Sequence, residues 1–142
     1  MKIKSIFWIV FAYILLIGCE SNLNSECYSN NYLEITASNL SKIGEFYELQ
    51  FLQDYIQTFS TIKAETGSVD AYQKLSWISN KEIFVNGYWT NLVNRSSYTD
   101  EKGEAYTVLG VWEEFIGDTV IVYCWYDDMC FDFIDSLKVI IR

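Results

Sequence analysis

The sequence predicts an α+β fold in which two helices precede a roughly five-stranded antiparallel meander. Two observations carry this prediction. Apolar residues recur at spacings of three and four between Leu40 and Glu65, as they do along one face of a helix. Beyond residue 80, short β-rich runs alternate with turn residues instead. Helices followed by consecutive antiparallel strands define an α+β arrangement, with the helices packed on one face of the sheet.

The first predicted helix spans about residues 40–65. Gly67 supplies its C-terminal stop, and Ser68 the N-cap of a second, shorter helix at about residues 69–78. Asp70 falls in the first turn of that second helix, where the helix dipole favours a negative charge. The apolar stripe of the first helix consists of Leu40, Ile43, Phe46, Tyr47, Leu49, Leu52, Tyr55, Ile56, Phe59 and Ile62.

The predicted strands are bounded by tight turns. Asn86-Gly87 lies between two β-rich runs and predicts a two-residue hairpin, in which Val85 pairs with Tyr88 and Phe84 with Trp89. Further strands are predicted at Ala105–Ile116, Thr119–Tyr126 and Phe131–Ile141, with a short additional strand in "NNYLEITAS" before the first helix. A helical start followed by a curled meander resembles the NTF2-like and cystatin-like rolls in architecture, and this likeness carries no functional residues.

The first 18 residues have the pattern of an export leader. Lys2 and Lys4 form a basic start, and the apolar run Ile6–Ile17 is 12 residues long. A helix needs about 20 apolar residues to cross a bilayer, so this run is too short to span one. Leu16-Ile17-Gly18-Cys19 then resembles the lipobox of bacterial lipoproteins.

That resemblance implies cleavage before Cys19 and acylation of Cys19 with palmitate-type chains. The predicted organisation is therefore a signal peptide (1–18), a lipidated flexible tether (19–31) and one α+β domain (32–142). The implied location is the bacterial cell envelope. Glu20 after the cysteine favours the outer membrane over the inner one, and the periplasmic or surface face stays open.

Charge restricts the partners. The chain carries 10 basic and 19 acidic residues. Loss of the leader removes Lys2 and Lys4, which leaves 8 basic residues against the same 19 acidic ones, a net charge of −11. Nucleic acids and anionic headgroups attract Lys and Arg rather than carboxylates. We therefore expect a protein partner, basic if charge contributes to recognition, and no nucleic acid.

The absence of histidine limits the chemistry. Ser-His and Cys-His nucleophiles, histidine bases and most zinc sites are excluded, and the sequence has no Gly-rich phosphate loop. Glu113 and Glu114 are adjacent in a predicted strand and would point to opposite faces, so they cannot act as a carboxylate pair. The acidic residues Asp127, Asp128, Asp132 and Asp135 match no calcium-loop spacing. We predict no catalysis, no cofactor and no metal site.

Three cysteines remain if Cys19 carries lipid. Cys124 and Cys130 flank the last predicted turn and form the preferred disulfide. The alternatives are a bond from Cys27 to one of them, or no disulfide. Because three is an odd number, at least one thiol stays free in each case.

Aromatic residues make up 18% of the chain, more than one small core needs. The surplus predicts a binding surface formed by Trp89, Trp112, Tyr123, Trp125 and Tyr126, with Tyr88 as a further candidate. The sequence thus predicts a non-enzymatic envelope lipoprotein with an acidic binding domain. One version is an inhibitor or immunity protein against a cationic cell-wall-targeting toxin. The alternative is a lipoprotein that binds a small ligand or a carbohydrate in an aromatic-lined pocket.

Overall fold

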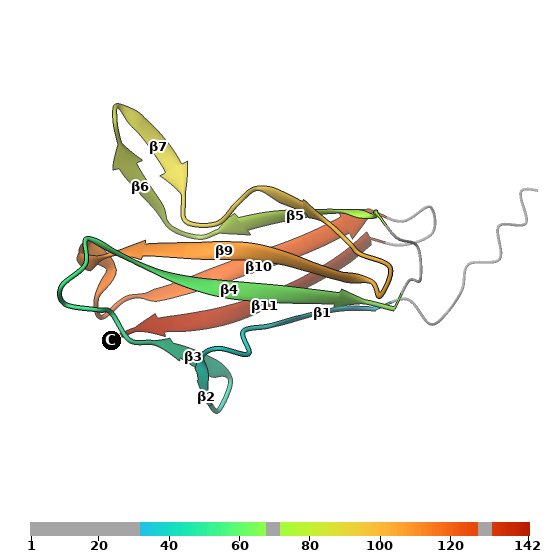
Figure 1. Cartoon of the computed structure of the whole chain (residues 1–142), viewed down its shortest axis with the longest axis horizontal. Helices are drawn as coiled ribbons and strands as arrows, with labels where there is room; N and C mark the ends of the chain where they lie inside the picture. Colours follow the sequence, from blue (N-terminus) through green and yellow to red (C-terminus); the bar gives the residue numbers. More distant parts are fainter. Residues whose placement is uncertain (1–31, 68–71, 128–131) are drawn as a thin grey trace, which may run out of the picture.

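A computed structural model describes residues 32–67, 72–127 and 132–142. These residues form a β-sandwich of a three-stranded and a six-stranded sheet, with a separate two-stranded hairpin projecting from it (Figure 1). The described residues contain no α-helix, and the single 3-10 turn among them is η1 (Glu113–Phe115). The predicted α+β fold is therefore wrong. No helix in this part of the chain has the length and apolarity that crossing a membrane requires.

The three-stranded sheet has the order β1-β4-β9, and both of its pairings are antiparallel. Its strands are β1 (Leu33–Thr36), β4 (Gln57–Thr66) and β9 (Glu104–Trp112). The register places Leu33 opposite Thr66 and Gln57 opposite Trp112. The start of β1 and the end of β9 therefore lie at opposite ends of the sandwich (Figure 1).

The six-stranded sheet has the order β2-β3-β11-β10-β5-β8, and the β3–β11 pair is its parallel pairing. Its strands are β2 (Ser41–Ile43), β3 (Phe46–Leu49), β5 (Lys74–Ser79), β8 (Ser96–Tyr98), β10 (Thr119–Asp127) and β11 (Asp132–Ile141). The long β10–β11 pairing runs from Thr119↔Ile140 to Asp127↔Asp132.

Alternating side chains of both sheets fill the core between the layers. Fully buried examples are Ile62, Leu75, Trp77, Leu109, Val122 and Val139. The indole nitrogen of Trp77 donates a hydrogen bond of 2.8 Å to Ser97 Oγ, so the largest buried side chain is satisfied as well as packed. This arrangement is an aligned two-sheet packing, in which each strand points alternate residues inward.

Several predicted strands are confirmed. The hairpin of β6 (Glu82–Val85) and β7 (Tyr88–Asn91) pairs Val85 with Tyr88 and Phe84 with Trp89, as predicted. Asn86 and Gly87 have φ values of 53° and 87°, the left-handed conformations that a type I′ turn requires. Strands β9, β10 and β11 agree with the predicted runs within a few residues, and β1 lies inside "NNYLEITAS".

The first predicted helix is replaced by β2, β3 and β4. Gly44, with φ 64°, begins a two-residue turn that pairs Ile43 with Phe46 and breaks the helical stripe. Along β4 the inward residues include Thr58, Ser60 and Thr66, which are polar. The pattern of apolar residues in the sequence therefore does not show the two-residue alternation of this strand. The helical spacing of Phe59 and Ile62 is therefore accidental, because these residues lie on opposite faces of β4.

The second predicted helix is contradicted by β5, where Leu75 and Trp77 point inward at the spacing of a strand. The predicted meander is also wrong in its connections. β9 belongs to the three-stranded sheet and β10 to the six-stranded one, so the turn after η1 crosses between layers. A small domain whose two sheets cover each other buries its apolar strand faces without helices.

Candidate functional site

Three segments lie at the end of the sandwich where β9 ends. They are the connection 50–56, the stretch 112–118 containing η1, and the β6–β7 hairpin; we call them together the hairpin end (Figure 1). The chain enters the fold at Leu33, at the opposite end.

The hairpin is held at its base by a buried pair of polar side chains. Asn91 Oδ1 accepts hydrogen bonds from the backbone nitrogen and Oγ of Ser79, each 2.9 Å long. Asn91 Nδ2 donates to the Ser79 carbonyl oxygen at 3.2 Å, and both residues are buried. Ile83 and Leu92 are buried beside this pair. These bonds fix the base of the hairpin to β5, because separating the two side chains would leave buried polar groups without hydrogen-bond partners and would destabilise the fold.

The rest of the hairpin exposes aromatic side chains. Phe84, Tyr88 and Trp89 are 59%, 76% and 66% exposed. The Phe84 and Trp89 rings contact each other across the two strands, with centroids 5.4 Å apart and planes tilted by 59°. Such a tilted pair restricts both side chains before any partner binds. The hairpin thus presents an ordered Phe84–Trp89 pair to solvent, with Tyr88 exposed next to it in β7.

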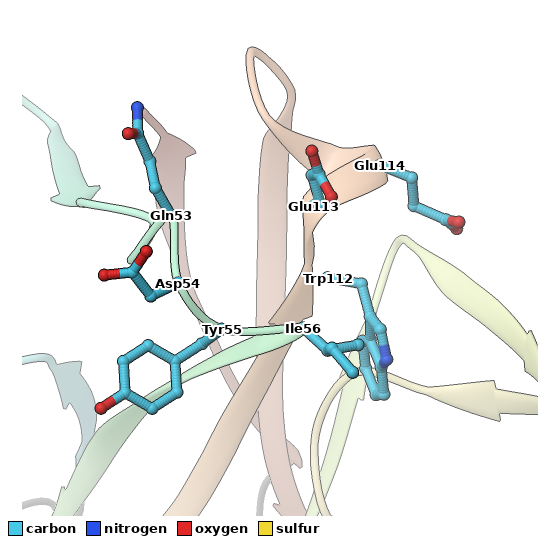
Figure 2. A pocket seen from close by; sticks show the side chains of 7 residues that line it. All are labelled: Gln53, Asp54, Tyr55, Ile56, Trp112, Glu113 and Glu114. Atoms are coloured by element: carbon cyan, nitrogen blue, oxygen red, sulfur yellow. The ribbon is translucent and has the colours of Figure 1, made fainter.

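An open hollow of about 660 Å³ lies between residues 53–56 on one side and residues 112–114 on the other. Figure 2 shows Ile56 beside the Trp112 ring, while Tyr55 and Glu114 point away from the hollow in different directions. Ile56 is 85% exposed, an unusual position for an isoleucine, and Trp112 is half-buried. The part of the hollow that Ile56 and Trp112 line is therefore apolar and accessible to solvent.

Both walls of the hollow are attached to the end of β11. Phe51 N donates to the Arg142 carbonyl oxygen at 2.7 Å, and Gly117 N donates to the Ile141 carbonyl oxygen at 2.9 Å. Phe115 of η1 is buried in the core. The separation of the walls is set by backbone hydrogen bonds and packing rather than by exposed side chains.

The hairpin end carries four exposed carboxylates, from Asp54, Glu82, Glu113 and Glu114. None of the four forms an ion pair with another described residue. Glu113 and Glu114 lie in η1 and not in the strand that the sequence predicted, because β9 ends at Trp112. Their side chains still point in different directions, so they do not converge as a carboxylate pair (Figure 2).

The five aromatic residues predicted as one surface lie in three different places. Trp89 belongs to the hairpin and Trp112 to the hollow. Tyr123 and Trp125 lie on the outward face of β10, opposite Ile78 and Ser76 of β5. Tyr126 points inward, where it is buried and stacks on Phe133 with ring centroids 4.8 Å apart. The structure brings Trp89 and Trp112 to the same end and gives Tyr126 a core role.

Sequence reasoning missed the other exposed apolar residues of the hairpin end. Tyr55 and Ile56 were assigned to the buried stripe of a helix, and they lie in a connection where they are 62% and 85% exposed. Phe84 is part of the predicted hairpin but not of the predicted binding surface. Its signal was present, since "IFVNGYW" is apolar on both faces of a two-stranded ribbon that can bury only one.

Cys124 is a free thiol on the inward face of β10, where it is fully buried. Its cross-strand neighbour is Asp135, and the β10–β11 ladder continues past this pair to Asp127↔Asp132. The local geometry thus differs from the expected five-residue loop closed by a Cys124–Cys130 bond. Cys19, Cys27 and Cys130 lie outside the described residues.

Desolvation in the core, with a smaller effect of the Asp135 charge, raises the pKa of the Cys124 thiol to about 12. Such a thiol stays protonated at neutral pH and is a poor nucleophile. As for metals, within residues 32–67, 72–127 and 132–142 no three side chains of the ligating types are grouped as a metal site requires.

Comparison with known proteins gives no relative from which a role can be transferred. The chain matches no family model and no curated protein.

Proposed function

We propose that this protein is a non-enzymatic, lipid-anchored binding protein of the bacterial envelope that contacts a protein partner through its hairpin end. The observation that carries the proposal is the hairpin itself. Three exposed aromatic side chains stand on a two-stranded ribbon whose base is fixed by the buried Ser79–Asn91 pair.

Exposed aromatic residues on a rigid support are what protein interfaces use. Tyr and Trp are enriched among residues that dominate binding energy, and they lose little conformational entropy on binding. The tilted contact of Phe84 with Trp89 fixes two of the rings in advance. A partner that covers them gains apolar burial without having to order the hairpin first.

The anchor belongs to the same proposal. Acylation of Cys19 and a tether of residues 20–31 would attach the domain to the membrane near Leu33, the end opposite the hairpin. The 12 tether residues reach at most about 40 Å when extended. The hairpin end would then be the end of the domain farthest from the point of attachment, where a partner in the envelope can reach it. An inhibitor or immunity protein that meets a cell-wall-targeting toxin in the envelope would use such an arrangement.

The alternative of a small-ligand or carbohydrate site has less support. Ligand pockets enclose 70–90% or more of a small molecule's surface. The hollow beside Trp112 and a second hollow between Ile78 and Trp89 are both open to solvent. Open hollows next to a protruding hairpin suit a macromolecular surface better than a small ligand.

The experiment compares proteins captured from envelope extract by three versions of the full chain. They are the wild type, the hairpin variant Phe84→Ser/Trp89→Ser and the sheet variant Tyr98→Ser/Ile134→Ser. The sheet variant removes two side chains of similar exposure, 61% and 71%, from the outward face of the six-stranded sheet.

We expect one protein to be retained by the wild type and the sheet variant and lost by the hairpin variant. Loss with the sheet variant alone would move the site to the outward face that carries Tyr123 and Trp125. Retention by both variants would reject the hairpin as the contact surface.

A further inference from the structure

We propose that the hollow beside Trp112 receives a basic segment of the partner, so that lysine or arginine side chains enter between residues 53–56 and η1. This inference rests on the proposed function for the existence of a protein partner. It adds the chemistry by which that partner is recognised, and it assigns this chemistry to a surface next to the hairpin.

Several carboxylates of the domain pair with a lysine or an arginine of the same chain, whereas those beside the hollow do not. On the body of the sandwich, Lys138 lies 2.8 Å from Glu45 and Arg142 lies 3.2 Å from Glu48. At the hairpin end, Lys81 lies 2.9 Å from Asp118. Asp54, Glu113 and Glu114 border the hollow, although the Glu114 side chain points away from it (Figure 2). The carboxylates of these three residues have no such cation among the described residues. Their charge is therefore available to a cation brought by another molecule.

An apolar surface lies in the hollow beside these carboxylates. Ile56 and the half-buried Trp112 lie together in the hollow (Figure 2). A lysine or arginine side chain has a long apolar stem that packs on such a surface while its charged head stays near carboxylates. The face of a tryptophan also attracts a cation directly.

The same combination already holds a lysine within this protein. Lys138 Nζ donates to Glu45 Oε2 at 2.8 Å and lies 5.3 Å from the centroid of the Phe46 ring. An aromatic ring and a neighbouring carboxylate therefore bind an ammonium group on the six-stranded sheet. The residues that line the hollow likewise include an aromatic ring, Trp112, and a carboxylate, Glu113, although the two side chains point in different directions (Figure 2). Neither is paired with a cation of the described residues.

The net charge of the chain favours a positively charged partner. The whole chain has a net charge of −9, so nucleic acids and anionic lipid surfaces are repelled. A basic protein surface is attracted, and its approach is faster at low ionic strength. The hairpin would supply apolar contact and slow dissociation, whereas the hollow would supply steering and selectivity for positive charge.

The test uses the full chain in neutral detergent micelles and an oligolysine peptide as the probe, followed by NMR. An oligoglutamate peptide of the same length is the comparison. We expect the indole N–H signal of Trp112 and the amide signals of residues 53–56 and 113–114 to shift on addition of oligolysine. The indole signals of Trp77 and Trp125 should not move, and oligoglutamate should have no effect.

Matched variants locate the binding. Asp54→Asn/Glu113→Gln/Glu114→Gln should weaken oligolysine binding about fivefold or more at low salt. Glu34→Gln/Glu101→Gln/Asp132→Asn removes the same number of exposed carboxylates elsewhere and should change the affinity less than about twofold. Equal weakening by both variants, no weakening by either, or shifts centred away from the hollow would overturn the proposal.

The hairpin variant separates the two proposals. Phe84→Ser/Trp89→Ser should bind oligolysine as the wild type does, although it loses the envelope partner. If the peptide result holds and no partner depends on the hairpin, the proposed function fails alone. If a partner depends on the hairpin and oligolysine does not bind at the hollow, the inference about basic segments fails alone.

Discussion

The carboxylate of Asp135 accepts a hydrogen bond of 2.8 Å from the backbone nitrogen of Ile35. Asp135 lies in β11 of the six-stranded sheet, and Ile35 in β1, the edge strand of the three-stranded sheet. This bond therefore joins the two layers where β1 carries the chain into the fold. It also explains why a carboxylate interrupts the inward apolar face of β11.

Replacing Asp135 with Ala should release β1. The backbone nitrogen of Ile35 would lose its acceptor, at a cost of about 1–3 kcal/mol in the free energy of unfolding. Denaturant unfolding measures the cost. Amide hydrogen exchange at Ile35 should speed up more than exchange in β10. Asp135→Asn keeps an acceptor oxygen and should lose less. Asp132→Ala, at an exposed position of the same strand, should stay within about 0.5 kcal/mol of the wild type.

Removal of the Asn91 side chain should free the hairpin. Asn91→Ala leaves the backbone nitrogen of the buried Ser79 without its partner, so we expect a loss of about 2–3 kcal/mol in stability. Amide exchange in residues 82–91 should speed up more than exchange in β9. Asn94→Ala serves as the control, since Asn94 is exposed and contributes its backbone carbonyl to Thr107. Similar exchange rates in the two variants would show that the Ser79–Asn91 pair does not hold the hairpin.

Cys124 should make stability depend on alkaline pH. The folded protein keeps the thiol proton up to a pKa of about 12, against an ordinary value of 9.0. The stabilisation is therefore complete below pH 9 and is lost as the pH rises toward 12. While it is being lost, the free energy of unfolding falls by up to about 1.4 kcal/mol per pH unit.

The difference in unfolding free energy between wild type and Cys124→Ala isolates this effect from the tyrosines and lysines that titrate in the same range. That difference should shrink steadily above pH 9. In the native protein at pH 8, mass mapping after alkylation should find Cys124 unlabelled, and labelling should appear after denaturation. A constant difference above pH 9, with rapid native labelling, would contradict the burial of this thiol.

The lipid anchor is predicted from Leu16-Ile17-Gly18-Cys19 alone. Cys19→Ser should abolish incorporation of a labelled fatty acid and leave the precursor uncleaved, because the acylated thiol is the group recognised for processing in the lipoproteins that this segment resembles. Gel mobility and metabolic labelling measure both effects. Cys27→Ser is the matched control and should be processed normally. Normal processing of Cys19→Ser would reject the anchor and leave the hairpin as the remaining basis of the function.

Parts of the fold were predictable because their signals are local. The Asn86-Gly87 turn predicted both the hairpin and its register, and β10 and β11 lie within a few residues of the predicted runs. The N-terminal half was mispredicted since β4 uses Thr58, Ser60 and Thr66 as inward residues. The hydroxyl groups of Ser60 and Thr66 donate to Asn39 Oδ1 and to the Gly103 carbonyl oxygen, and these partners lie far away in the sequence.

The candidate site followed the same division. Trp89 and Trp112 were selected from composition and do lie at the hairpin end. Tyr55 and Ile56 were hidden in a spurious helical stripe, and Tyr126 was selected although it is buried. Which aromatic residues reach the surface depends on how the two sheets cover each other. A single sequence shows which residues of a strand share a face, but it does not show in which of the two sheets the strand lies.

The most direct test of the hairpin as the binding surface is site-specific photo-crosslinking in cells of the native host. A photoreactive amino acid replaces Tyr88 at the hairpin, or Tyr98 on the outward face of the six-stranded sheet; these side chains are 76% and 61% exposed. We predict one discrete cross-linked protein from position 88, none from position 98, and loss of the product when Trp89 is also replaced by Ser. A product from position 98 alone, or equal products from both positions, would contradict the account.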